Sequence, residues 1–346
     1  MEDLRIVKLG PRIIKTGIAV ALALYICSVL NLESAVFAGI TAIHTIQPSI
    51  YRTWKQAWSQ VQTNIFGGII GLLGLFFLGN DPFSIGLVII IVIAISLKFN
   101  KAETISLTLV TVLAIMSAPG DEDWSFALNR FVVTFIGMMT ALLINILISP
   151  PNYKKNYLLK VKTIFDNMSI LMRTVISNEM TEKSFTEQME QLENDLLQLE
   201  EQYRLFDEES KISKVKNLDL REIVVFKQMF KSLQQGFIVI ENIEAFYFAN
   251  KPTEEDNLFF DRQLEHLSKY HELFLMKFEG KIKEDEPHFE EDFMNESEAF
   301  LEKVMSSYNH EKPKLTVIGS SIYHYAFQID RLNTVVEQYI KKIQEK

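Results

Sequence analysis

The sequence predicts an all-α polytopic membrane protein, with six transmembrane helices followed by a cytoplasmic antiparallel helical bundle. Three observations predict this class. Residues 1–150 contain six apolar runs and are nearly neutral, with 9 Lys and Arg against 8 Asp and Glu. Residues 151–346 carry 26 and 36 of these residues, a net charge of −10, and their apolar residues recur at steps of three and four, the period of an α-helix. Pro150 and Pro151 stand between the halves and prevent simple continuation of a helix, so we expect the domain hinge there.

The six apolar runs are the candidate membrane spans. A spanning helix needs about 20 mainly apolar residues, and lipid offers no partners to unpaired backbone groups, so only helices are expected here. The first, third and sixth runs reach this length, whereas the second, fourth and fifth are short enough to be buried, tilted or partly re-entrant. The runs lie near residues 13–32, 35–50, 61–79, 83–99, 104–119 and 126–149.

The charges of the loops predict the orientation. Basic residues gather before the first run, between the second and third, between the fourth and fifth, and after the sixth, while the alternate loops are acidic. This alternation indicates a multi-pass protein of the bacterial plasma membrane with both termini in the cytoplasm. Because further spans follow at once, the first run is interpreted as a retained span and not as a signal peptide. The basic residues are Arg5, Lys8, Arg12, Lys15, Arg52, Lys55, Lys98, Lys101, Lys154, Lys155, Lys160 and Lys162.

Small residues predict where the spans pack together, because they let helix backbones approach closely in lipid. The candidates for helix packing are Gly39, Gly67, Gly68, Gly71 and Gly137. The third run also opens like the sixth, with a polar residue followed by a glycine seven positions later (Asn64 to Gly71, Arg130 to Gly137). Such a match fits an inverted repeat of three spans, a plan that transporters use, and chance similarity of two short segments is the competing interpretation.

Two stretches carry a family resemblance, residues 37–74 and 129–153. Gln47-Pro48 follows a span of small residues, basic residues come soon after, and Arg130…Thr134…Gly137 leads to the Pro-Pro exit. In these features the chain resembles the aromatic acid exporter family of bacterial membrane proteins, which is related to the fusaric acid resistance proteins. The resemblance implies an exporter of small organic acids. Within the family, the chain is similar to the short members, which have six spans and a helical cytoplasmic domain. Where relatives tend to open the third span with Arg, this chain has Asn64.

Polar residues inside spans are candidates for a transport path, since they are costly in lipid. His44 has the pKa range of a proton relay or an anion contact; a neutral histidine bonded between helices is the alternative. Arg130 is the basic residue of the outer side and offers a fork of donors to a carboxylate; the alternative is an interface anchor paired with the acidic residues 121–123. Gln47, Asn64 and Asn145 complete the candidate path, the asparagines also being candidates for hydrogen bonds between helices.

The sequence of the second half predicts five or six helices and contains no recognisable catalytic or cofactor-binding motif. Apolar seams run through residues 157–175, 185–203, 223–240, 260–278, 289–304 and 322–343, and Ser184-x-x-Glu187 and Thr253-x-x-Asp256 are typical of capping boxes. No phosphate loop, zinc motif or catalytic constellation occurs in this half, so no cofactor, metal or enzymatic activity is predicted. His271 lies on an apolar seam and is interpreted as a core histidine.

These observations favour an exporter of small organic acids, aromatic acids among them, that works as a homo-oligomer in the lipid bilayer. The alternative is a membrane-anchored sensor or adaptor that transports nothing and uses the bundle for interactions. A net-acidic second half argues against nucleic acid as a partner, because phosphate binding needs clustered Lys and Arg. A cavity reaching His44 or Arg130 favours transport, and a dry, fully packed core favours an anchor.

Overall fold

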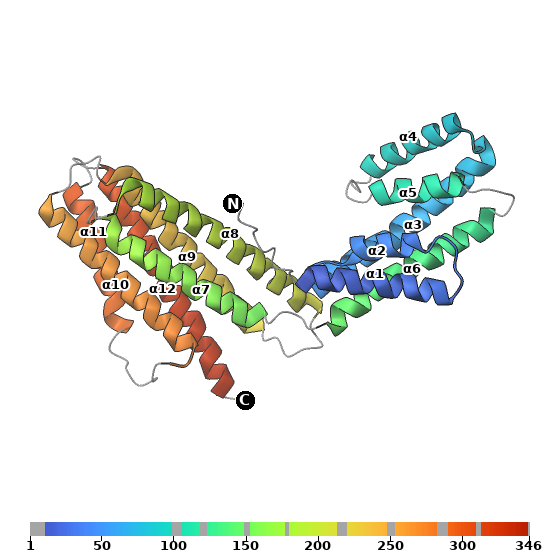
Figure 1. The fold of residues 1–346 in the computed structure, drawn as a ribbon. Helices are drawn as coiled ribbons and strands as arrows, with labels where there is room; N and C mark the ends of the chain where they lie inside the picture. Colours follow the sequence, from blue (N-terminus) through green and yellow to red (C-terminus); the bar gives the residue numbers. More distant parts are fainter. Residues whose placement is uncertain are drawn as a thin grey trace, which may run out of the picture. The chain divides into compact units, whose positions relative to one another are not determined.

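The computed structural model describes residues 11–98, 105–117, 123–148, 153–176, 180–212, 220–247, 253–281, 290–308 and 313–344. These residues form twelve α-helices and no strand (Figure 1), which confirms the all-α class. The chain divides into two compact units, Met1–Pro151 and Asn152–Lys346. The expected hinge, Pro150 and Pro151, lies outside the described residues.

The first unit contains the six apolar helices. Three of them are long and apolar enough to cross a membrane, and these lie in the first, third and sixth predicted runs. The other three are shorter apolar helices, as their sequences indicate. The helices are α1 (Pro11–Val29), α2 (Val36–Thr45), α3 (Ile50–Leu78), α4 (Pro82–Lys98), α5 (Ile105–Met116) and α6 (Asp123–Leu147).

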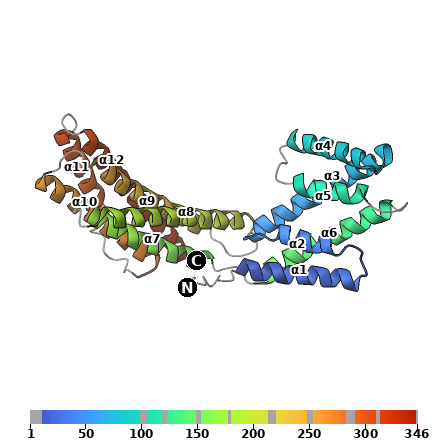
Figure 2. The ribbon, with the colours of Figure 1, turned by 45° about the horizontal axis from the view of Figure 1, so that its top comes forward.

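Within this unit the helices form two groups that share α3. Helices α1, α2 and α6 pack against one another, α4 packs against α5, and α3 contacts α5 and α4 as well as α6. Figure 2 shows α4 and α5 beside α3, with α1, α2 and α6 together. The core of the first group is made of small side chains such as Ala19, Ala38 and Ala141. Small side chains let these helix backbones approach closely.

Helix α3 is longer than the sequence predicts, because the basic stretch expected to be a loop is its first part. Ser49 starts the helix by accepting a hydrogen bond from the backbone N–H of Arg52 at 3.0 Å, which is the role of an N-cap residue. The helix ends at Gly79, whose positive φ of 80° suits glycine. Its 29 residues extend about 44 Å at 1.5 Å per residue, beyond the about 30 Å of a hydrocarbon core.

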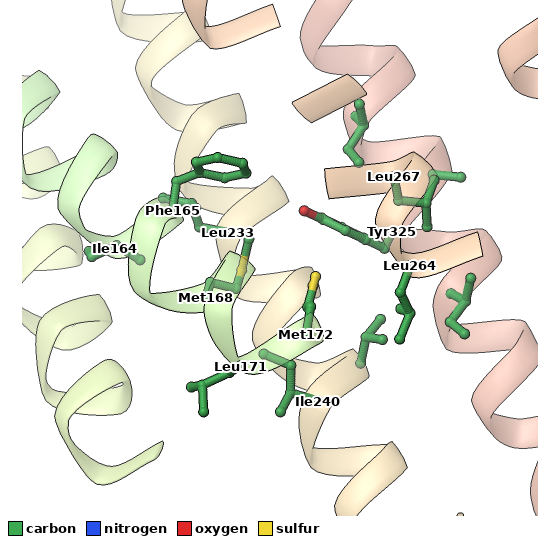
Figure 3. Packing of buried hydrophobic residues seen from close by; sticks show 14 of the residues in the cluster. Ile164, Phe165, Met168, Leu171, Met172, Leu233, Ile240, Leu264, Leu267 and Tyr325 are labelled. Carbon is green, nitrogen blue, oxygen red and sulfur yellow. The ribbon is translucent and has the colours of Figure 1, made fainter. Parts of the chain in front are cut away.

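The second unit is a bundle of six helices, at the upper number predicted. They run along one another in both views (Figures 1 and 2). Large apolar side chains from α7, α9, α10 and α12 meet in its interior (Figure 3), where Tyr325 points its hydroxyl into the core. The helices are α7 (Tyr153–Val175), α8 (Glu182–Ile212), α9 (Leu220–Phe246), α10 (Glu254–Phe278), α11 (Glu290–Tyr308) and α12 (Pro313–Gln344).

One of the two predicted helix caps in this unit is confirmed and the other is wrong. Thr253 and Asp256 form a reciprocal capping box at the start of α10. Helix α8 begins earlier than predicted, at Glu182, and Ser184 donates its backbone N–H to the hydroxyl of Thr181 at 3.4 Å. Ser184 therefore lies in the first turn of α8. The sequence Thr181-x-x-Ser184 lacks the Glu or Gln of a capping box. The more typical pattern Ser184-x-x-Glu187, three residues later, therefore predicted the wrong start for this helix.

His271 lies in the core of the bundle, as predicted. Its side chain is fully buried, with Ser232 Oγ 3.2 Å from Nε2 and Tyr325 Oη 2.7 Å from Nδ1. Since the Ser232 hydroxyl donates to the Met229 carbonyl, Ser232 accepts from Nε2–H and Tyr325 donates to Nδ1. Burial lowers the pKa of His271 to about 3 and raises the pKa of Tyr325 above its ordinary value. Both groups are therefore neutral at physiological pH.

The buried His271 makes the bundle sensitive to acid. Below the ordinary pKa of 6.5 the unfolded chain binds a proton that the folded bundle excludes, until pH about 3. The free energy of unfolding therefore falls as the pH drops through this window, by about 1.4 kcal/mol per pH unit at full effect. The amide of His271→Gln can hydrogen-bond but does not titrate. We expect this variant to be less stable than the native chain at pH 7.5, and we expect this deficit in the free energy of unfolding to shrink as the pH falls to 5.0. Hydrogen exchange of α9, α10 and α12, compared between the two chains at each pH, measures this deficit, and a constant deficit would contradict the assignment.

Candidate functional site

Arg130 is a buried cation in the third turn of α6. Its side chain is 6% exposed, and its Cζ lies 3.5 Å from the centre of the Phe37 ring of α2. Nη2 donates one long hydrogen bond, 3.4 Å, to the carbonyl of Val110 in α5. Nε and Nη1 have no hydrogen-bond partner among the described residues. Arginine keeps its charge in proteins, and a buried donor without a partner is costly, so within the described part of the chain two donors of this guanidinium still lack an acceptor.

A pocket of about 230 Å³ opens beside Arg130. Its polar lining consists of Arg130, Asn64 of α3 and Thr111 of α5, and the Thr111 hydroxyl donates to Asn64 Oδ1 at 2.7 Å. The rest of the lining is apolar or glycine: Ile65, Gly68, Ile69, Leu72, Ile115, Leu128 and Phe131. Apolar walls with a few convergent polar groups are typical of small-molecule sites, and a volume below about 300 Å³ suits a ligand smaller than a drug-sized molecule.

The pocket brings together residues that lie far apart in the sequence. Asn64 and Arg130 occupy equivalent positions in the internal comparison of the third and sixth runs, and both line this pocket. Asn64 uses its amide to donate to the Gln60 carbonyl at 2.9 Å. Arg130 therefore supplies the positive charge of the pocket, and Asn64 and Thr111 supply neutral polar groups. The chemistry fits a small organic molecule with one anionic group.

The predicted ion pair of Arg130 falls largely outside what the structure describes. Residues 121 and 122 are outside the described residues, and the side chain of Asp123 is not described. The described contacts of Arg130 are the ring of Phe37 and the carbonyl of Val110. A guanidinium over an aromatic face is attracted by the ring electrons, so Phe37 holds one face of the guanidinium and leaves its edge for hydrogen bonding.

Asn145 is the centre of a second polar cluster, near the other end of α6. Its amide donates to the Thr53 hydroxyl at 2.7 Å and to the carbonyls of Ser49 and Gln47 at 3.2 and 3.3 Å. Its Oδ1 accepts a hydrogen bond from the buried ammonium of Lys15 at 3.1 Å. The cluster ties α1 and α6 to the turn between α2 and α3. Gln47 takes part through its backbone, while its side chain donates to the carbonyl of His44.

We expect Asn145→Leu to destabilise the first unit. Leucine removes four hydrogen bonds from a mostly buried cluster, and a typical hydrogen bond contributes about 0.5–1.5 kcal/mol to stability. The matched control is Asn129→Ala in the same helix, because Asn129 makes one exposed hydrogen bond to the Glu33 carbonyl. Thermal unfolding in detergent, followed by helical circular dichroism, should show a clear drop in midpoint for Asn145→Leu and little change for the control. Equal midpoints would refute a structural role for the cluster.

His44 belongs to neither polar cluster. Helix α2 buries Thr41 and Thr45, whereas His44 is exposed on the surface of the first unit. The Thr45 hydroxyl instead contacts Gln60, at 3.0 Å from its Oε1. The alternative interpretation of His44, a hydrogen bond between helices, is not found among the described residues, because this side chain lies on the outer face of α2.

The candidate packing glycines lie where helices touch. A Cβ built on Gly39 meets Val20 of α1 at 3.4 Å, and on Gly67 it meets the Thr108 carbonyl of α5 at 3.1 Å. On Gly137 it overlaps the carbonyl oxygen of Ala38 in α2. Gly71 faces Ile115 and Val112 at 3.3 to 3.4 Å, whereas Gly68 has its nearest neighbour at 3.9 Å and borders the pocket.

Three residues of these sites are absent from the predicted path. Lys15 was interpreted as a loop charge, although the four-residue step from Lys15 to Ala19 puts it on the buried face of α1. Thr111 and Phe37 carry no distinguishing pattern in the sequence. A threonine and a phenylalanine are common in apolar helices, so only the packing of the helices identifies them.

Known proteins resemble the whole chain and, more specifically, its first unit. Residues 7–148 match the model of a family described as "Aromatic acid exporter family member 1". The UPF0421 protein YgaE of Bacillus subtilis (strain 168) is 33% identical over 344 residues, 96% of each chain. A UPF0421 protein of Bacillus cereus (strain ATCC 10987 / NRS 248) is 24% identical over 344 residues, 96% of this chain and 94% of the relative. A UPF0421 protein of Oceanobacillus iheyensis is 30% identical over 156 residues, 45% of each. The likeness to the two Bacillus proteins covers both units.

Proposed function

We propose that this membrane protein, which belongs to the same family as the UPF0421 protein YgaE and whose residues 7–148 match the aromatic acid exporter family, exports small organic acids, aromatic acids among them, from the bacterial cell. The observation that carries the proposal is the buried Arg130, a cation that lines a pocket with apolar walls and has two donors without a partner among the described residues. A carboxylate accepts strong, charge-assisted hydrogen bonds from a guanidinium. The apolar walls suit the organic body of the same ligand.

All six apolar helices of the first unit belong to the proposed membrane domain, with both termini in the cytoplasm. Support for this orientation comes from the alternation of basic and acidic loops in the sequence. Helices α2, α4 and α5 are short, and we propose that they cross with tilt or with partners. A second copy of the chain would supply such partners, and six spans are modest for a complete path, so a homo-oligomer is part of the proposal.

Arg130 acts on the anion and not on a proton in this proposal. The pocket holds no carboxylate among the residues that line it, so an entering anion meets attraction without competition from a fixed negative charge. When the guanidinium replaces part of the water shell of the anion, the free-energy cost of moving the anion into an apolar environment falls. The pocket is thereby suited to an intermediate binding step during passage across the bilayer.

Reconstituted vesicles test the proposal. The full chain is inserted into lipid vesicles that are preloaded with a panel of small aromatic and aliphatic carboxylic acids, each paired with its neutral amide. We expect protein-dependent release of acids and no protein-dependent release of the amides, because only the acids carry the charge that Arg130 binds. If folded, helical protein releases none of the acids above the rate of empty vesicles, the function as an exporter is wrong and a membrane-anchored interaction protein takes its place.

A further inference from the structure

One end of the second unit gathers basic side chains from helices that are distant in sequence. This end is formed by the starts of α7 and α9 and the ends of α10 and α12 (Figure 1). Lys154 at the start of α7 pairs with Glu222 at the start of α9, and the Tyr339 hydroxyl near the end of α12 donates to the same carboxylate at 3.1 Å. The ring of Phe278, which ends α10, lies 5.5 Å from the ring of Tyr339. These contacts hold the four helix ends together.

Two hollows on this end are each lined by three basic residues. The first, of about 440 Å³, is lined by Arg221, Lys341 and Lys342 together with Val224, Val335, Gln338 and Tyr339. The second, of about 350 Å³, is lined by Lys154, Lys155 and Lys162 together with Leu158, Leu159 and Glu279. We call these six basic residues and their hollows the basic end. The unit as a whole has a net charge of −10, so the basic end is a local reversal of its charge.

Not every lysine of this region contributes to the basic end. Lys160 belongs to the same basic stretch as Lys155 and Lys162, but its side chain points into the bundle and binds the buried carboxylate of Asp195 at 2.5 Å. Lys154 is paired with Glu222. Lys155, Lys162, Lys341 and Lys342 form no ion pair with the residues that the structure describes. Their ammonium groups therefore remain available to an external anion.

Exposed aliphatic side chains stand among these cations. Leu159 lines the second hollow and is 56% exposed, and Val224 lines the first and is 51% exposed. Basic side chains next to exposed aliphatic ones are typical of surfaces that lie in the headgroup region of a membrane, where cations meet phosphates and aliphatic groups reach the acyl boundary. A soluble polyanion such as nucleic acid would use the cations but not the aliphatic side chains.

The chain itself keeps this end near a bilayer. Five residues separate the end of α6 at Leu147 from the start of α7 at Tyr153, and α6 is one of the helices long and apolar enough to cross a membrane. We infer that the basic end is a docking surface for the headgroups of anionic lipids, with Leu159 and Val224 reaching into the interface. The cytoplasmic leaflet is the negatively charged surface that attracts such segments next to a span.

The acidic remainder of the second unit orients this docking. A net charge of −10 on residues 151–346 is repelled by an anionic surface, while the basic end is attracted, so the two contributions turn the same end toward the lipid. The attraction extends about 10 Å at 0.1 M salt and about 3 Å at 1 M. The inference rests on the cytoplasmic placement of the second unit in the proposed function, but it requires no transport.

The test uses the full chain in lipid nanodiscs with an environment-sensitive fluorophore. Cys27 is the single cysteine and is buried in α1, so Cys27→Ala allows labels at Leu159→Cys and Val224→Cys. The control label is Leu258→Cys, a leucine that is also well exposed and lies near the start of α10, at the opposite end of the bundle. Nanodiscs contain either phosphatidylcholine alone or phosphatidylcholine with phosphatidylglycerol, and a trace of lipid with a quencher in its acyl chain.

We expect at least about twofold stronger quenching at positions 159 and 224 with phosphatidylglycerol than without it, background quenching at 258, and loss of the effect at 1 M salt. The charge reversal Lys155→Glu with Lys341→Glu should remove the effect, whereas Lys183→Glu with Lys314→Glu, at the opposite end, should not. Equal quenching in both lipids, or equal loss in both reversals, overturns the inference. Inorganic phosphate that removes the quenching at constant ionic strength also overturns it, in favour of a soluble anion. Transport is not measured, so failure here leaves the proposed exporter standing.

Discussion

Arg130→Gln is expected to abolish most of the release of carboxylic acids from vesicles while the helical fold is retained. Glutamine keeps a polar amide of similar reach but loses the charge and the fork of parallel donors. A hydrogen bond to a charged group contributes about 1.5–3 kcal/mol, so losing one such bond should slow release at low acid concentration by roughly tenfold to a hundredfold. Initial rates of release for the acids that the native chain carries give the measurement.

Two further variants separate charge from geometry at this position. Arg130→Lys keeps the positive charge without the planar fork, so we expect intermediate rates. Asn129→Ala, the neighbouring residue with its hydrogen bond to Glu33 outside the pocket, should leave the rates unchanged. If Arg130→Gln releases acids at the native rate, the pocket at Arg130 is not part of the path, whatever the rest of the chain does.

Gly137→Ala is expected to destabilise the first unit more than any other single methyl addition at its candidate packing glycines. The added Cβ would overlap the Ala38 carbonyl oxygen and lie 3.0 Å from the Thr41 Cβ. Neither neighbour is the end of a flexible side chain, so α2 and α6 must move apart. Overpacking of this kind costs about 1–3 kcal/mol, occasionally more. Thermal midpoints in detergent, followed by far-ultraviolet circular dichroism, should fall clearly below the native value.

Gly86→Ala is the matched control for this prediction. Gly86 lies in α4, and no heavy atom comes within 4 Å of a Cβ built there. Alanine is a better helix former than glycine by about 0.5–1 kcal/mol, so the control should be neutral or slightly stabilising. A midpoint for Gly137→Ala equal to that of Gly86→Ala would mean that the close contact of α2 and α6 does not hold this unit together.

The helices were predictable because their signals are local. A seam such as the one that steps from Ile322 to Ile343 fixes both the helix and its buried face without any knowledge of its neighbours. The boundaries were less secure, as α3 illustrates. Its first turns carry Arg52 and Lys55 and look like a loop by charge, yet Ser49 caps them as helix. Charged residues indicate that a segment is in contact with water, and this is as true of an exposed helix as of a loop.

The candidate site could be predicted only in part, because it depends on which helices touch. The sequence singles out Arg130 and Asn64 as polar residues in apolar runs, but 66 positions separate them, and only the contacts of α3, α5 and α6 place both at one pocket. His44 had the same sequence signal and faces outward. Lys160 and Lys155 were equivalent as loop charges, yet one binds Asp195 inside the bundle and the other stays exposed.

Helix α3 shares contacts with both helix groups of the first unit, and this gives it a mechanical role. Displacement of the α4–α5 pair relative to α1, α2 and α6 is transmitted mainly through α3, because α5 meets α6 only over a small area that includes the hydrogen bond from Arg130 to Val110. The face that α3 turns to α5 includes Gly67 and Gly71, and Asn64 on the same face accepts a hydrogen bond from Thr111. Where a glycine faces the neighbouring helix, close contact resists separation but offers few steric obstacles to sliding. The α3–α5 interface therefore favours sliding of one helix along the other at its glycines, whereas the α2–α6 contact at Gly137 holds its two helices in place.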